Sequence, residues 1–367
     1  MKITAAVTRS PGAPMTLEQL DLEAPQAGEI LVKIVAVGVC HTDMVMRDQH
    51  IPVPLPAVMG HEASGIVEAL GAGVHKVAVG DHVVLSFNSC GECPSCRDHQ
   101  PAYCYDFFGR NFGGRRPDGS SALSRECTAV SGNVFGQSSF ATHALCHEAN
   151  VVKVRNDAPL RLLGPLGCGI QTGAGAVMNA LKVRPGSSFL VFGAGSVGLS
   201  AIMAAKLMGA AFIFAADLKP ARREIALELG ATHAFDPTLG DMESQIAQLV
   251  PAGLDYVLDT TGIPAVITGA IKLLAPRGVC GLVGAAAPGA TSSFDLTHVM
   301  SAGRVIRGIV EGESDIDNFI PKLVELYMEG RFPFDRLVRY YPFDAIEQAI
   351  HDSETGVAIK PILLMPD

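Results

Sequence analysis

Four cysteines crowded into one short loop are the most concentrated metal-binding side chains of this sequence. The run CGECPSCRDHQPAYC separates them by two, two and seven residues, and they are Cys90, Cys93, Cys96 and Cys104. Glycine and proline between them can turn the loop, so four thiolates can close a tetrahedral zinc shell; the alternative is a pair of disulfides or unrelated thiols. A four-thiolate shell has no open coordination position. We therefore predict a structural zinc ion that holds a lobe without a core of its own.

A second set of metal-binding residues is spread along the chain. It consists of Cys40 in CHTD, His61 in GHE and Cys168 in LGCGIQTGAG. Two thiolates and a neutral imidazole balance a zinc dication and leave a fourth position for water or an alcohol oxygen. Each residue alone is more typical of an ordinary buried core side chain. Together, beside the cysteine loop and the nucleotide motif described next, they favour a catalytic zinc site.

The run GAGSVG has the pattern of a dinucleotide-binding turn. Its candidate cofactor contacts are Gly193, Gly195, Val197 and Gly198. The run follows an apolar strand, SFLVF, and opens a helix, so its glycines let the backbone approach a pyrophosphate at the positive helix end. Asp217 closes the next predicted strand, nineteen residues after the third glycine. An acid there binds ribose hydroxyls and repels a 2′-phosphate, which predicts NAD, although Arg222 is near enough to soften that preference.

The elements that must position these residues follow two sequence patterns. Residues 1–169 are rich in turns and short β-like runs, and residues 170–309 repeat strand, glycine turn and helix. The second pattern is typical of a doubly wound parallel sheet. The predicted fold class is therefore α/β, with an additional, irregular and mainly-β domain. Residues 310–367 carry two helices and a final strand, and we expect them to return to the first domain. The sequence thus predicts a catalytic zinc-binding domain, 1–169 and 310–367, and a dinucleotide-binding domain, 170–309.

The composition limits the possible partners. The 367 residues are 48% hydrophobic and 18% charged, with a net charge of −9 and no cluster of basic residues. This gives no electrostatic support for binding nucleic acid or an anionic membrane. Two nearly uncharged stretches, 162–181 and 189–205, are dense in glycine and are better explained by buried elements than by membrane spans. The N-terminus lacks the features of a signal peptide, so we expect a cytoplasmic protein.

With these motifs in hand, the sequence resembles the zinc-containing medium-chain alcohol dehydrogenases over nearly its full length. CHTD, GHE, the cysteine loop, GCGIQTGAG, GAGSVG and ELGATHAFDP carry the likeness. LPAVMGHE, FFGRNFGG and FGQSSFATHAL make it most similar to the bacterial aryl-alcohol (benzyl alcohol) dehydrogenases, although geraniol-type and glutathione-dependent formaldehyde dehydrogenases share much of this frame. The resemblance implies a Rossmann cofactor domain beside a GroES-like catalytic domain, and two zinc ions per subunit. It also implies NAD-linked conversion of a primary alcohol, aryl or allylic, to its aldehyde.

The resemblance also assigns roles to single residues. Cys40, His61 and Cys168 become the catalytic zinc ligands, and the four-cysteine loop holds the structural zinc. Thr42 takes the alcohol proton, Asp43 orients the histidine ligand and Glu62 lies near the metal. His41 and Lys360 match contacts to the cofactor pyrophosphate, and Thr172 matches a position behind the nicotinamide ring. Without the resemblance, Asp43 and Glu62 are as readily explained by ordinary charges in a turn, and the alternative for His41, Lys360 and Thr172 is a solvated or packed side chain.

Several features are left open by the sequence. Many family members have a proton-relaying histidine where this chain has Val45, so the relay must end in water or in a nearby group such as His50. Aromatic candidates for the wall of an alcohol pocket are Phe87, Phe107, Phe108 and Phe112, although aromatic clusters are more often ordinary core residues. The family implies a homodimer or homotetramer, for which the run 279–310 can supply an edge strand. A rival of another class is a nucleotide-binding zinc scaffold that has lost catalysis.

Overall fold

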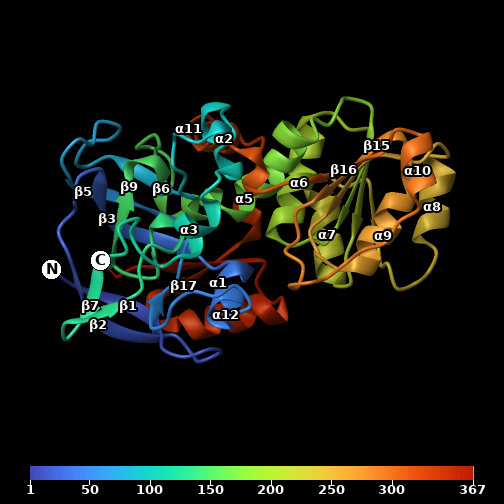
Figure 1. Cartoon of the computed structure of the whole chain (residues 1–367). Coiled ribbons are helices and arrows are strands. Elements are labelled where there is room, and N and C mark those ends of the chain that lie inside the picture. Colours follow the sequence, from blue (N-terminus) through green and yellow to red (C-terminus); the bar gives the residue numbers. More distant parts are fainter. Residues whose placement is uncertain (367) are drawn as a thin grey trace. The chain divides into compact units, whose positions relative to one another are not determined.

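The chain divides into two compact units, each described here by itself. The structure is a computed structural model in which residues 1–366 are described (Figure 1). Unit 1 contains residues 1–169, 315–330 and 334–367, and unit 2 contains residues 170–314 and 331–333. Which unit binds zinc and which binds the dinucleotide stays a prediction.

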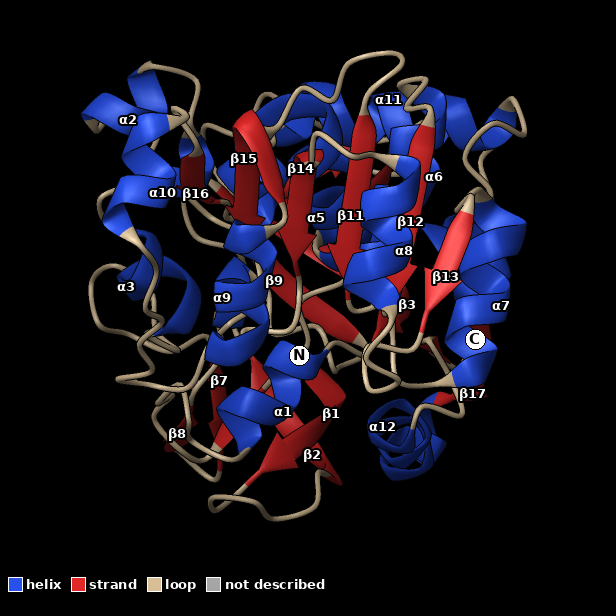
Figure 2. Ribbon diagram, turned by 90° about the vertical axis from the view of Figure 1, so that its right-hand side faces the viewer, coloured by secondary structure: helices blue, strands red, loops and turns tan. Residues whose placement is uncertain are grey.

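Unit 2 is built on one parallel sheet of six strands, in the order β13-β12-β11-β14-β15-β16 (Figure 2). The strands are β11 (Ser188–Phe192), β12 (Phe212–Ala216), β13 (His233–Phe235), β14 (Leu254–Asp259), β15 (Leu274–Leu282) and β16 (Val305–Gly308). The helices that alternate with them are α6 (Ser196–Leu207), α7 (Pro220–Leu229), α8 (Met242–Leu249), α9 (Pro264–Lys272) and α10 (Leu296–Ser301). The strand order reverses between β11 and β14, which confirms the doubly wound α/β sheet predicted from the sequence.

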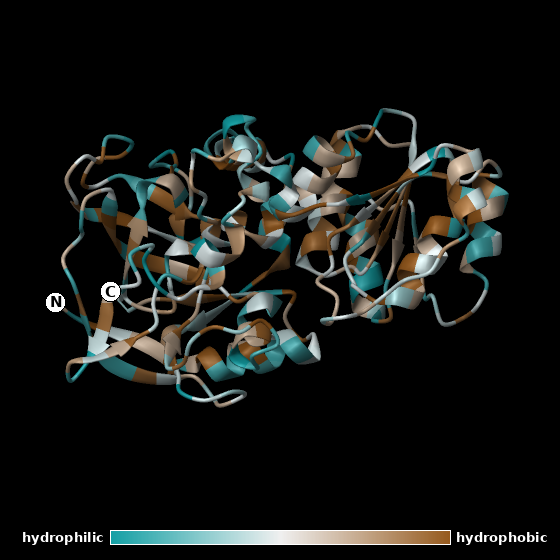
Figure 3. Ribbon diagram, in the orientation of Figure 1, coloured by the Kyte–Doolittle hydropathy of each residue, from teal (hydrophilic) through white to brown (hydrophobic). Residues whose placement is uncertain are grey.

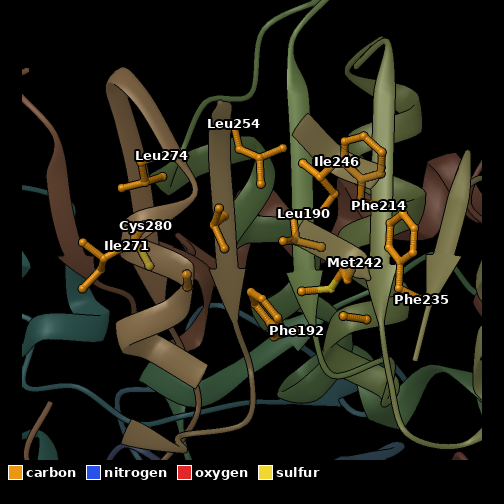
Figure 4. Close-up of a cluster of buried hydrophobic side chains, with 13 residues drawn as sticks. Leu190, Phe192, Phe214, Phe235, Met242, Ile246, Leu254, Ile271, Leu274 and Cys280 are labelled. Atoms are coloured by element: carbon orange, nitrogen blue, oxygen red, sulfur yellow. The ribbon is translucent and has the colours of Figure 1, made fainter. Parts of the chain in front are cut away.

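Both faces of this sheet are covered. Leu190 and Phe214 belong to a buried cluster that also includes Met242 and Ile246 of α8 and Ile271 of α9 (Figure 4). The intervening strand residues, such as Phe189 and Val191, are buried as well. Successive side chains of a strand point to opposite faces, so neither face is open to solvent. This is why the central strands β11 and β12 are almost uniformly hydrophobic (Figure 3).

Unit 1 contains two mainly antiparallel sheets. One has the order β4-β1-β2-β7-β8, and the other β10-β6-β5-β3-β18-β17, with β9 also paired to β3. The strands of the first are β1 (Lys2–Thr8), β2 (Thr16–Leu22), β4 (Ala57–Val58), β7 (Leu123–Arg125) and β8 (Thr128–Val130). The strands of the second are β3 (Glu29–Gly38), β5 (Ala63–Leu70), β6 (His82–Leu85), β9 (His143–His147), β10 (Val151–Lys153), β17 (Val338–Pro342) and β18 (Lys360–Leu364). The mainly-β character expected for the first part of the chain is confirmed.

The helices of unit 1 are short except near the C-terminus. They are α1 (His41–Arg47), α2 (Pro94–Arg97), α3 (Phe107–Phe112), α4 (Leu160–Leu163), α11 (Ile316–Met328) and α12 (Ile346–Thr355). The red α12 contacts the blue α1 (Figure 1), so the end of the chain joins the part that carries CHTD. None of the helices within residues 1–366 combines the length and the apolar character that a membrane crossing requires.

The pairing of β3, β5 and β18 brings together three distant parts of the sequence. Val37 of β3 is opposite Ala63 of β5, and Gly38 is opposite Ile362 of β18. In antiparallel pairs the end of one strand lies beside the start of the next. The residues just after β3, those just before β5 and the first residue of β18 therefore meet at one edge of the sheet.

The glycine-rich run GIQTGAG forms a helix, α5 (Gly169–Gly175), although glycine is more typical of turns than of helices. A Cβ atom on Gly173 would lie 2.0 Å from the carbonyl oxygen of Val197, and one on Gly175 would lie 2.3 Å from that of Gly312. Glycine is thus required by close packing of the helix against backbone, and not by a turn.

Candidate metal centres and cofactor site

Four side chains that can bind a metal meet at the sheet edge described above. Cys40, His61, Glu62 and Cys168 each direct one ligand atom into a cluster in which all four atoms lie within 4.8 Å of one another. His61 and Glu62 are fully buried. Cys40 lies between β3 and α1. His61 and Glu62 are adjacent in the sequence and immediately precede β5. The structure therefore brings together the three residues predicted as catalytic ligands and adds a carboxylate.

Asp43 connects both sides of this cluster. Its Oδ1 atom lies 2.9 Å from Nδ1 of His61 and accepts a hydrogen bond from the backbone amide of Gly60 at 3.0 Å. Its Oδ2 atom accepts from the amide of Cys40 at 3.1 Å, in the reach-back geometry of an acidic residue in the first turn of a helix. Asp43 is fully buried. CHTD thus encodes a helix start whose capping carboxylate also fixes one ring nitrogen of His61.

The chemistry of the cluster fits a zinc ion. Nε2 of His61 is buried and has no hydrogen-bond partner among the described residues, which is expensive for an imidazole unless a ligand completes it. Burial opposes protonation of His61, but the carboxylate of Asp43 outweighs it and raises the pKa of the ring, which makes a stronger ligand. A hydrogen bond with Cys168 lowers the pKa of the Cys40 thiol well below its ordinary value, and the charge of Lys360 adds to this shift. A thiol inclined to ionise, a second thiol beside it and one open imidazole nitrogen are a zinc donor set.

Glu62 is paired with Lys360 inside the protein. Nζ of Lys360 donates to Oε1 and Oε2 of Glu62 at 3.0 and 2.8 Å and to the carbonyl oxygen of Val39 at 3.2 Å. Oε1 also accepts from the amide of Gly169 at 3.0 Å. Burial raises the pKa of Glu62, whereas the adjacent ammonium of Lys360 opposes that shift.

This placement bears on the contact to a cofactor phosphate expected for Lys360, which stays a prediction. The side chain of Lys360 is 1% exposed, and its three N–H groups have three acceptors inside unit 1. The ammonium neutralises Glu62, which would leave two thiolates to balance the charge of a divalent cation held at this cluster.

The four-cysteine loop forms a second, separate cluster. The sulfur atoms of Cys90, Cys93, Cys96 and Cys104 all lie within 4.8 Å of one another, and these cysteines are free thiols. Backbone amides point at the sulfurs: that of Cys93 lies 3.2 Å from the sulfur of Cys90, and that of Tyr105 lies 3.5 Å from the sulfur of Cys93. The amide of Tyr105 lowers the pKa of Cys93 to about 6, whereas burial raises the pKa of Cys96 to about 12. A divalent cation is what would ionise all four sulfurs together, so the disulfide alternative has no support here.

The GAGSVG run of unit 2 follows β11 and continues into the first turn of α6. Gly193 has φ +90°, and a Cβ atom on Gly198 would lie 1.9 Å from the carbonyl oxygen of Gly193, so both positions need glycine. A Cβ atom on Gly195 would meet nothing within 4 Å, which leaves the backbone there open to a ligand. Val197 lies in the first turn of α6. This is the strand, turn and helix start that a pyrophosphate requires.

Asp217 follows β12 at the same edge of the sheet. It is 7% exposed, and its carboxylate accepts from the amides of Ala194 at 2.7 Å and Lys219 at 2.8 Å. A carboxylate has about four acceptor positions, so two stay available for ribose hydroxyls. A nitrogen of Arg222 lies 3.7 Å from Oδ2, near enough to reduce the repulsion of a 2′-phosphate.

The remaining predicted residues are placed as follows. His41 is the exposed first residue of α1, and Oγ1 of Thr42 lies 3.8 Å from the sulfur of Cys40. Thr172 is buried in α5 and donates to Oε2 of Glu311 at 3.4 Å. Val45 lies within α1 and offers no proton acceptor.

The candidate wall residues form a connected aromatic group. Rings of Phe87, Phe107, Phe108 and Phe112 pack against one another in unit 1. The sequence did not indicate that this group continues to Phe135, whose ring stacks on His61. Gln137 was missed as well: its amide donates to the carbonyl oxygen of His61 at 3.0 Å. Both belong to FGQSSF, a run with no periodicity that would identify them.

Comparison with known proteins places the whole chain. Residues 26–156 match the family described as "Alcohol dehydrogenase GroES-like domain", and residues 196–326 match "Zinc-binding dehydrogenase". A geraniol dehydrogenase of Castellaniella defragrans is 48% identical over 98% of this chain and 97% of its own length. A benzyl alcohol dehydrogenase of Acinetobacter calcoaceticus has a crystal structure that is 49% identical, with a TM-score of 0.97 and complete coverage of both chains. A zinc-binding-domain alcohol dehydrogenase of Burkholderia ambifaria is 52% identical, with a TM-score of 0.98 and the same coverage.

These likenesses extend over both units and agree with the two metal-binding clusters and the nucleotide turn. The chain therefore belongs to the zinc-binding medium-chain alcohol dehydrogenases, enzymes with a GroES-like domain and an NAD-binding Rossmann domain.

Proposed function

We propose that this enzyme oxidises primary alcohols whose hydroxyl carbon is attached to an aromatic ring or an allylic double bond, with NAD as the hydride acceptor. Two relatives that match over nearly their whole length, a benzyl alcohol dehydrogenase and a geraniol dehydrogenase, support this substrate class. Both molecules are apolar primary alcohols next to a π-system. The observation that carries the reaction type is the buried Cys40, His61 and Cys168 cluster, in which the free ring nitrogen of His61 faces two thiols.

In this proposal Cys40, His61 and Cys168 hold the catalytic zinc. When bound, zinc supplies Lewis acidity toward the alcohol oxygen, and NAD supplies the hydride acceptor. Asp43 keeps His61 in the tautomer that leaves Nε2 free, because its carboxylate accepts a hydrogen bond from the N–H group at Nδ1. Lys360 cancels the charge of Glu62, so the centre keeps the net charge of two thiolates.

Thr42 is the first proton acceptor in the proposed mechanism. Its hydroxyl lies beside the sulfur of Cys40, and a hydroxyl can accept one proton while it donates another. From there the proton must reach solvent without a side chain at position 45, because Val45 cannot carry it. We propose that water takes the proton, with His41 on the exposed start of α1 as a contact for the cofactor pyrophosphate.

In unit 2, Gly193, Gly195, Val197 and Gly198 provide the turn for the pyrophosphate. Asp217 provides acceptors for the adenosine ribose, and its buried negative charge disfavours the 2′-phosphate of NADP. Thr172, held by Glu311, is the proposed neighbour of the nicotinamide ring. Arg222 lies beside the ribose-binding acid.

The cysteine loop holds the second, structural zinc in this proposal. Its residues are exposed or half-buried except for Cys104 and Ala102, so the loop has almost no hydrophobic core of its own. Four metal–sulfur bonds would supply the missing stability. Nine free thiols also support our placement of the enzyme in the reducing cytoplasm.

We also propose a homo-oligomer formed through the edge of the parallel sheet. β16 is the last strand of that sheet, and apolar side chains beside it are exposed: Leu296 by 75%, Met300 by 74% and Val305 by 45%. A strand at the edge of a sheet with exposed apolar neighbours is a common site of self-association. Sedimentation velocity of the purified enzyme would distinguish a dimer or tetramer from a monomer.

The experiment that tests the activity is a side-by-side substrate assay. NADH formation is measured with benzyl alcohol, geraniol, ethanol and the glutathione adduct of formaldehyde. We expect kcat/KM for benzyl alcohol or geraniol to exceed that for ethanol by at least roughly tenfold. A preference for ethanol or the adduct would contradict the substrate class. No turnover with any of them, together with about one zinc per subunit instead of two, would support the non-catalytic scaffold.

A further inference from the structure

An aromatic side chain lies flat against the histidine of the catalytic cluster. The ring of Phe135 is stacked on His61 with 4.5 Å between ring centroids and 24° between ring planes. Both rings are buried, with exposed fractions of 3% for Phe135 and 0% for His61. Since Asp43 holds only Nδ1, the imidazole can still tilt about that nitrogen. A flat neighbour on one face limits this motion.

Phe135 reaches this position through an unfavourable backbone. Its φ is +51°, in the left-handed region that bulky residues rarely adopt, and Asn133, Gly136 and Ser138 in the same loop are also left-handed. Non-glycine residues persist there only when the surroundings dictate the conformation. A loop that served only to fill the core would not need this backbone, since a phenylalanine can be buried from an ordinary strand or helix.

Buried hydrogen bonds hold the loop in this conformation. The amide of Val134 donates to Oγ of Ser138 at 2.9 Å, and that hydroxyl donates to the carbonyl oxygen of Val58 at 2.7 Å. Nδ2 of Asn150 lies 3.3 Å from the carbonyl oxygen of Phe135 and 3.2 Å from that of Gly136. The backbone around Phe135 is thus fixed on both sides of the residue.

The ring itself is held from its other side. Phe112 meets Phe135 edge to face, with 5.2 Å between centroids and 76° between planes. Such tilted contacts are favourable for aromatic rings and define their orientation. The order of contact is therefore Phe112, Phe135, His61, and the last of these directs Nε2 at the two thiols.

We propose that Phe135 is a positioning residue for the catalytic metal centre: its stacked ring holds the His61 imidazole in the plane from which Nε2 binds the ion. This inference rests on the proposed ligand set Cys40, His61 and Cys168. It differs from a role in general core packing, because it predicts that metal affinity depends on an aromatic face at position 135 and not on buried volume alone.

The test uses the holoenzyme after selective removal of the catalytic metal by a chelator, followed by titration with Co²⁺. Phe135→Met and Phe135→Leu keep a buried apolar side chain but remove the flat face, and Phe135→Tyr keeps it. We expect Co²⁺ affinity to fall by roughly tenfold or more in the Met and Leu variants, as for other groups that orient ligands. The visible Co²⁺ absorption should shift with it, since it reports ligand geometry. Phe135→Tyr should keep the affinity and spectrum of the wild type.

Phe343→Leu is the matched control, because it removes a buried aromatic ring of unit 1 that lies outside the aromatic group in contact with His61. It should leave Co²⁺ affinity unchanged, and thermal unfolding of every variant gives its loss of stability. Wild-type Co²⁺ binding in the folded Met or Leu variant would overturn the proposal. So would an equal loss of affinity in Phe343→Leu, which would indicate a general effect of core packing. If the wild-type enzyme itself bound Co²⁺ without sulfur-to-metal charge transfer, the proposed ligand set would fail instead.

Discussion

Replacement of Lys360 by methionine tests whether this side chain neutralises Glu62, as its contacts indicate, or binds the cofactor phosphate, as the family resemblance implies. Lys360 and Glu62 are 1% and 0% exposed, and their closest atoms are 2.8 Å apart. Removal of one partner from such a pair leaves an uncompensated buried charge, which costs about 3–5 kcal/mol. For a domain of this size each kcal/mol lowers the unfolding midpoint by about 2–4 °C, so we expect a decrease of roughly 6–20 °C.

The chain offers a matched control. Lys153 and Asp81 are also 2.8 Å apart, but the side chain of Lys153 is 55% exposed. An exposed pair contributes about 0–1 kcal/mol, so Lys153→Met should shift the midpoint by a few degrees at most. The double variant Lys360→Met/Glu62→Gln removes both charges and keeps an acceptor for the amide of Gly169. It should recover most of the stability lost in Lys360→Met.

The assay is thermal unfolding of the zinc-replete enzyme at one scan rate, combined with KM for NAD. The reasoning would be refuted if Lys360→Met unfolded together with the wild type while KM for NAD rose strongly. That result would return Lys360 to the cofactor phosphate. A double variant no more stable than Lys360→Met would show that the ammonium does more than neutralise Glu62.

Four further predictions concern single residues. Asp43→Asn should weaken retention of the catalytic zinc by about 10–100-fold, measured as the rate of metal loss to a chelator; unchanged loss would contradict its orienting role. Cys93→Ser should leave one zinc per subunit by mass spectrometry and lower the unfolding midpoint, and retention of two zinc ions would disprove the four-sulfur site. Asp217→Ser should raise kcat/KM with NADP relative to NAD; an unaltered ratio would place cofactor selectivity elsewhere. Val45→His should change the pH profile of kcat below about pH 8, and an identical profile would mean that proton transfer at this position does not limit turnover.

The sequence was sufficient where chemistry depends on residue type and on a local frame. In the cysteine loop and in GAGSVG, the residues that act together lie within a few positions of one another in the sequence. Their spacing was therefore enough to predict the cysteine cluster and the glycine turn. The parallel sheet was also predictable, because strands buried on both faces are continuously apolar. The short strand β13, His233–Phe235, escaped prediction because two of its three residues are only partly buried.

What the sequence could not indicate depends on long-range packing. Lys360 lies 298 residues from Glu62 in the chain, and only the pairing of β5 and β18 with β3 brings them together. Phe135 lies in a loop without periodicity, and its value of φ follows from hydrogen bonds to distant residues such as Asn150. The need for glycine in α5 could not be predicted for a related reason: the sequence reveals the flexibility of these residues, but not the backbone that approaches them.

The carboxylate of Asp43 links the start of α1 and the segment that carries Gly60 and His61 into a single cooperative unit. It accepts from the amides of Cys40 and Gly60, which belong to segments that are distant in the unfolded chain. Local opening of either segment must break the contacts of the other, so both amides should exchange their hydrogens with solvent at one common rate. Binding of the metal would slow that shared opening, and deuterium uptake at these two amides would then report occupancy of the centre without any substrate being turned over.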